Sequence, residues 1–258
     1  MHGSERPARG AGHPAGRPEG GRSTRRAPAL LLVLLLSVAA LALRIPVAGV
    51  ADLLSPPGRL LPLWPQTLVW SLLGLAWVLF ARRSYAHLRA RTGTRRVFAA
   101  GRRQPDVRDD PRTTALALLL FVVALLSAVI IPPLLVGEWT MQPVQIWLGL
   151  YGTYGTSVAL TTAAWLVFHT GSTAVLVLIL ALVQALAETR IRRVWVMRTP
   201  LGGLVLGIGL GVFDLISGGW ADLATAVISC TLLGAVHLLV GRRLGWTLAG
   251  AWFLLLLL

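Results

Sequence analysis

The chain of 258 residues contains no lysine, a single cysteine and only ten acidic residues. Charged residues make up 13% of it, about half the share of a typical soluble domain, which argues against a soluble globular enzyme. Cys230 alone forms no intramolecular disulfide and no cysteine-based metal cluster, and its apolar surroundings predict a small buried side chain. The sequences H-E-x-x-H, Walker A and G-x-S-x-G are also absent, so the chemistries of those motifs are not expected.

Long apolar blocks take the place of the missing charges. Hydrophobic residues make up 55% of the chain, and a block of about 18 or more apolar residues predicts a membrane span. Runs such as Leu30 to Leu36 do not alternate between polar and apolar residues, as the strands of a membrane barrel would. We therefore predict an all-α, polytopic transmembrane helix bundle over residues 28–258, with about eight spans, in the cell membrane.

The basic residues are all arginine, and they cluster. Of the 24 arginines, six lie in residues 1–27 and ten in residues 82–112. Such clusters are typical of cytoplasmic flanks, so we expect a cytoplasmic N-terminus and the lipid bilayer, not nucleic acid, as the partner. Residues 1–27 predict a disordered tail. Residues 82–112 predict a solvated cytoplasmic loop, with an amphipathic helix on anionic lipid as the alternative.

Two features complicate the path of the chain. The first block, Ala27 to Leu43, predicts an uncleaved helix, with a signal peptide as the alternative. Further on, polar breaks at Tyr151–Thr156 and His169–Ser172 leave three apolar blocks between Arg112 and Arg190, although two cytoplasmic flanks require an even number of crossings. Either an extra re-entrant piece or an arginine group at atypical depth would resolve this conflict. Both solutions predict a polar cavity near Glu188.

Two carboxylates interrupt the apolar runs of the last third. Ionisable groups at membrane depth cost about 2.5 kcal/mol or more and tend to be functional. Glu188 ends one run, and it is either an ion-pair partner of Arg192 one helical turn away or a general base. Asp214 lies inside a glycine-rich run and needs a counter-charge, such as Arg190 or Arg193, or an early helix end that exposes it to water.

Other residues in this third have structural interpretations. We expect His237 to be a hydrogen-bonded packing residue and His169 to lie at the membrane interface. Gly203, Gly207 and Gly211 are spaced four apart, which permits close approach of a neighbouring helix.

Residues 174–258 resemble the CPBP family of CAAX-processing and bacteriocin-processing intramembrane proteases, also called Abi proteins. The family's motif E-E-x-x-x-R corresponds to Glu188–Arg193, with threonine in place of the second glutamate. Its motif F-x-x-x-H corresponds to Leu210–Asp214, with leucine and aspartate in place of phenylalanine and histidine. Gly241–Leu248 looks like the lead-in to the third motif, H-x-x-x-N or H-x-x-x-D, whose own positions fall on Gly250 and Leu254.

The resemblance implies an intramembrane endopeptidase that cleaves a transmembrane or lipid-linked peptide. It assigns catalytic roles to Glu188, Arg193 and Asp214 and leaves the metal and any cofactor unknown. Because most of the family's catalytic residues are replaced, we expect a divergent or catalytically decayed member.

Two other functions stay open. A small transporter or channel subunit would use the break at Tyr151–Thr156 and Asp214. A membrane scaffold would bind a partner through the arginine-rich loop or the stripe of three glycines.

Overall fold

The computed structural model describes residues 26–44, 63–92, 111–137, 142–191, 193–215 and 219–257. Every regular element in these ranges is helical, which confirms the all-α class. The predicted disordered tail, apart from its last two residues, lies outside the described residues. The elements are α2 (Arg26–Ala42), α4 (Leu63–Thr92), α5 (Pro111–Val136), α6 (Gln142–Tyr154), the 3-10 helix η2 (Gly155–Val158), α7 (Ala159–Arg190), α8 (Val194–Arg198), α9 (Leu201–Leu215), α10 (Trp220–Leu239) and α11 (Leu244–Leu257).

Four of these helices are long and apolar enough to cross a membrane, namely α4, α5, α7 and α10. Three more, α2, α9 and α11, are apolar but shorter. Helices of this length and apolarity indicate a membrane protein. The expected number of eight spans is not confirmed.

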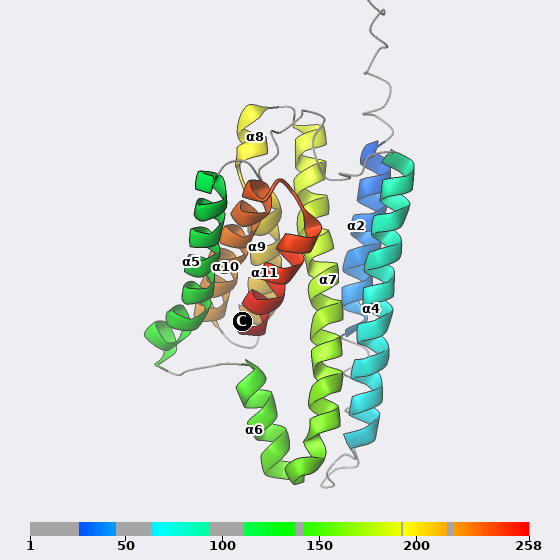
Figure 1. Ribbon diagram of the computed structural model, residues 1–258, viewed down its shortest axis with the longest axis vertical. Coiled ribbons are helices and arrows are strands. Elements are labelled where there is room, and N and C mark those ends of the chain that lie inside the picture. The colour runs from blue at the N-terminus through cyan, green and yellow to red at the C-terminus, as the bar shows by residue number, and fades with distance from the viewer. Residues whose placement is uncertain are drawn as a thin grey trace, which may run out of the picture.

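Helix α7 is the centre of the bundle. Helices α2 and α4 pack on one side of it, and α5, α9, α10 and α11 lie on the other (Figure 1). Over half of the α7 span, 56%, is buried inside the protein, against 11% for α4 and 17% for α5. The outer helices therefore present their apolar side chains outward, as helices in contact with lipid do.

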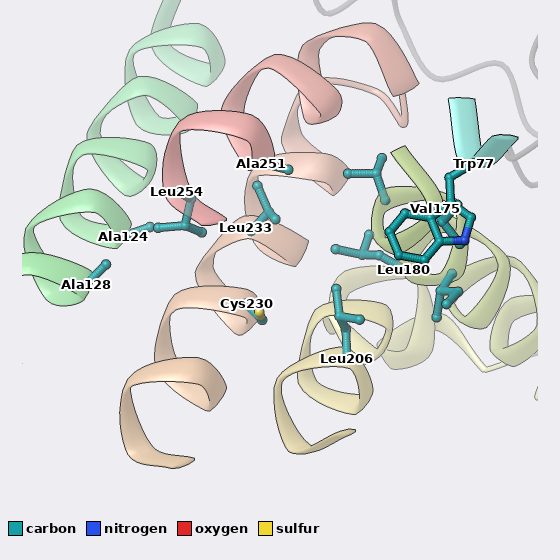
Figure 2. Packing of buried hydrophobic residues seen from close by; sticks show 12 residues of the cluster. Trp77, Ala124, Ala128, Val175, Leu180, Leu206, Cys230, Leu233, Ala251 and Leu254 are labelled. Atoms are coloured by element: carbon teal, nitrogen blue, oxygen red, sulfur yellow. The ribbon is translucent and has the colours of Figure 1, made fainter. Parts of the chain in front are cut away.

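The core forms where side chains from both sides meet α7. Val175 and Leu180 of α7 lie between Trp77 of α4 and Leu206 of α9, with Leu233 of α10 beyond (Figure 2). Cys230 is fully buried in the same cluster, as predicted.

The predicted break at His169–Ser172 is wrong, because α7 runs through it without interruption. A β-carbon on Gly171 would collide with the backbone of Gly74, so the small residue serves close packing of α7 against α4. The hydroxyls of Thr170 and Ser172 donate to the carbonyls of Leu166 and His169 within the helix. Two of the three apolar blocks thus merge into one helix. Helices α5 and α7 are then two candidate spans between Arg112 and Arg190, which is the even number that two cytoplasmic flanks require.

The prediction of a loop over residues 82–112 is wrong for residues 82–92, which are helical. Helix α4 continues to Thr92, because Leu88 is buried and Tyr85 half-buried against α2 and α7 while the arginines point outward. Arginine, alanine and leucine are also good helix formers. Residues 93–110 lie outside the described part of the chain.

Candidate functional site

A buried ion pair in the described structure joins α7 to the α10–α11 turn. Glu188 Oε1 lies 2.7 Å from Arg242 Nη2. The two side chains are 1% and 4% exposed, respectively. Such a pair is stable only when its geometry is good and further hydrogen bonds offset the loss of water.

The backbone of the α10–α11 turn explains why Arg242 reaches α7. Gly241 and Arg242 both adopt positive φ, +68° and +59°. The N–H of Arg242 donates to His237 O (2.9 Å) and that of Gly241 to Leu238 O (3.2 Å), which is the Schellman pattern of a helix C-terminus. Positive φ is uncommon outside glycine, so the turn holds Arg242 in one direction, with its side chain against Glu188.

Gln184, one helical turn before Glu188, ties this ion pair to two further elements. Its Nε2 donates to Glu188 Oε1 (2.9 Å) and to the carbonyl of Val196 in α8 (3.2 Å). Its Oε1 accepts the N–H of Gly202, in the first turn of α9 (3.0 Å). We call Gln184, Glu188 and Arg242 the Glu188 cluster, and it joins α7, α8, α9 and the α10–α11 turn.

The structure does not bring the three predicted catalytic residues together. Glu188 is buried in its cluster, whereas Arg193 is exposed at the start of α8. Asp214 is the second-last residue of α9, twelve residues after Gly202, which corresponds to a rise of about 18 Å. Its side chain lies outside the described part of the structure. Glu188 and Asp214 therefore belong to opposite ends of the bundle.

The partner found for Glu188 is Arg242, 54 residues away in sequence. The expected pair with Arg192 stays a prediction, because Arg192 lies outside the described residues. Glu188 Oε1 already accepts from both Arg242 and Gln184, while Oε2 is buried without a partner among the described residues. A general base must lie within hydrogen-bond reach of the proton that it removes. Glu188 is buried and instead joins helices through its bonds to Gln184 and Arg242.

Both buried histidines make packing contacts. His237 Nδ1 lies 2.7 Å from Thr247 Oγ1 of α11, which confirms the hydrogen-bonded packing residue. His169 is buried within α7, with Nε2 3.0 Å from the carbonyl of Trp252 of α11, and its expected position at the membrane interface stays a prediction. Its ring also stacks on Trp165.

The glycine stripe packs as predicted. A β-carbon on Gly203, Gly207 or Gly211 would collide with α10. The break at Tyr151–Thr156 falls on the end of α6 and on η2, at the end of the bundle opposite α8 (Figure 1).

Neither a metal site nor a relative identifies the cluster. No group of three or more His, Cys, Asp or Glu side chains that could hold a metal ion occurs in the ranges that the structure describes. Comparisons of the chain with protein-family models, curated proteins and solved structures found no match.

Sequence reasoning missed two members of the cluster, Gln184 and Arg242. Gln184 had a local signal, since it precedes Glu188 by four residues within one apolar run and so shares its helix face. Arg242 had a weaker signal: Gly241 precedes it, and glycine is typical of the position just after a helix end.

Proposed function

We propose that the chain is a CPBP-like membrane protein that binds a transmembrane or lipid-linked peptide without cleaving it. One observation carries this proposal: Glu188, the residue that matches the family's first glutamate, is held by Arg242 in a buried ion pair. A carboxylate with this partner stabilises the bundle and is not placed to activate a water molecule.

The other motif positions support the loss of proteolysis. Leu254 is fully buried in the core, and Gly250 faces the ring of Phe121, so these two positions of the family's third motif contribute packing. Asp214, at the position of the second motif, belongs to the far end of α9. The described partners of Glu188 are Gln184 and Arg242, neither of which is the second carboxylate or the histidine of the family's motifs.

The distribution of arginine supports a cytoplasmic position for one end of the bundle. The C-terminal ends of α4 and α7, helix α8 and the α10–α11 turn all lie at this end, together with the start of α5 (Figure 1). Each of these places carries arginine. By the positive-inside rule we assign this end, and with it the N-terminus of α2, to the cytoplasm.

The two alternative functions gain less support. A transport path through Tyr151–Thr156 is disfavoured because Tyr151 is exposed at the end of the bundle. A scaffold that binds through the glycine stripe is disfavoured because α10 already covers that face.

The test is to reconstitute the full chain and the Glu188→Gln variant into liposomes with membrane-anchored and lipid-linked peptides. Mass spectrometry would follow both cleavage and the amount of intact peptide that co-purifies with the protein. We expect intact peptide to be retained and cleavage to stay at the level of protein-free liposomes for both chains. Cleavage by the wild type that Glu188→Gln abolishes would overturn the proposal, and so would the absence of any retained peptide.

A further inference from the structure

The C-terminal part of α4, residues Arg82–Thr92, forms a basic strip on the outside of the bundle. We call it the α4 extension. Arg82, Arg83 and Arg91 are exposed along it, whereas Leu88 is 1% exposed and faces the protein. The extension begins where the apolar part of α4 ends, so its first arginines stand at the boundary of the hydrocarbon layer.

The neighbouring helix α2 is apolar at the same level. Leu88 packs in one cluster with Leu30 and Val33 of α2. Trp77 Nε1 of α4 donates to Ala40 O of α2 (2.9 Å), so the two helices are antiparallel, and Arg82 and Arg83 are level with the stretch between Val33 and Ala40. Leu35 and Leu36 of that stretch are 59% and 49% exposed. Exposed arginine and exposed leucine therefore occur at one height on two helices that are in contact.

Few negative charges are near enough to neutralise this strip from within the described chain. Glu188 is the only described acidic side chain at this end of the bundle, and Arg242 holds it. Asp222 is in the first turn of α10, which lies at the other end (Figure 1). An anion from outside the chain would meet a strong positive field here.

We propose that α2 and the α4 extension together bind an anionic glycerophospholipid. Its phosphate would lie against Arg82 and Arg83, and an acyl chain would lie along the outward face of α2 that begins at Leu35 and Leu36. Arginine suits this role because its planar guanidinium forms paired hydrogen bonds with phosphate, and its long stem keeps the charge at the headgroup level. A soluble anion would make no use of the leucines, so the surface fits a lipid better than free phosphate.

The test uses the full chain in detergent, titrated with phosphatidylglycerol or phosphatidylcholine and followed by native mass spectrometry. The variant R82Q/R83Q/R91Q removes three charges from the strip. The matched control R190Q/R193Q/R198Q removes three exposed charges from the end of α7 and from α8. Since each basic residue near an anionic surface contributes about 1 kcal/mol, we expect the strip variant to lose about a hundredfold of its affinity for phosphatidylglycerol. The control should keep its preference for that lipid.

Three results would overturn the proposal. In the first, the wild type would show no preference for phosphatidylglycerol. In the second, both triple variants would lose that preference equally, which would indicate a diffuse charge effect. In the third, inorganic phosphate at millimolar concentration would displace the lipid, which would indicate a site for the free anion. Thermal unfolding of both variants, in which only exposed side chains change, would establish that they are folded.

Discussion

Helix α7 buries two ionisable side chains in very different surroundings. Glu188, near its C-terminal end, is bonded to an arginine and to a glutamine that reaches α8 and α9. His169, nineteen residues earlier, is bonded to one carbonyl of α11 and is otherwise surrounded by aromatic rings. A buried charge needs a counter-charge and a shell of hydrogen bonds, whereas a neutral group needs one partner. We therefore expect the charged end of α7 to be much more sensitive to substitution.

The largest expected effect is that of Arg242→Met. It leaves Glu188 buried without its counter-charge, and removal of one partner of a buried ion pair costs about 3–5 kcal/mol. The measurement is the free energy of unfolding of the purified protein, titrated with a denaturing detergent. Arg198→Met, at an exposed arginine of α8, is the control and should change stability by no more than about 0.5 kcal/mol.

The double variant Glu188→Leu/Arg242→Met separates the ion pair from the fold. Replacement of a whole buried pair by apolar side chains is often neutral or stabilising, so most of the loss should be recovered. If Arg242→Met is no less stable than Arg198→Met, the cluster does not hold the two helices together.

A substitution in α9 tests whether charge is in fact what distinguishes the Glu188 end. Gly203 follows Gly202, the residue bonded to Gln184, but its own contacts are uncharged backbone: a β-carbon there would collide with Cys230 O and lie 2.8 Å from Gly234 Cα of α10. Gly203→Ala should therefore cost about 1–3 kcal/mol through overpacking alone. Gly209 of the same helix has open space around it, so Gly209→Ala should instead stabilise α9 by up to about 1 kcal/mol.

Both glycine variants are measured in the same unfolding titration. A loss for Gly203→Ala as large as that for Arg242→Met would mean that packing matters as much as charge at this end. A loss for Gly209→Ala would contradict the assignment of its face as open.

Local patterns in the sequence were enough to predict the helical class, the buried cysteine and the glycine stripe, because each shows in the composition or the spacing of residues within one helix. They were misleading where a tertiary contact decides. Gly171 and its polar neighbours resemble a break until Gly74 of α4 is packed against them. The start of the basic loop is helical because Leu88 finds a place between α2 and α7.

The partner of Glu188 was beyond such reasoning for a different reason. It comes from a residue 54 positions away, and it depends on a turn in which Gly241 and Arg242 both adopt positive φ. Residue spacing within one helix indicates only partners about one turn away, and it carries no information about a residue in another element.

The smallest expected effect belongs to the neutral site. Trp252→Phe removes the hydrogen bond from the indole N–H to Thr170 Oγ1 (3.0 Å) but keeps an aromatic ring beside His169. Hydrogen bonds between membrane helices contribute about 0.6 kcal/mol on average, with a maximum near 1.7. We expect a loss in that range from the detergent titration. Thr170→Val should give a similar loss, and the double variant should lose less than the sum of the two, because both changes remove the same bond. Should Trp252→Phe cost as much as Arg242→Met, the contrast between the charged and the neutral group on α7 would not hold.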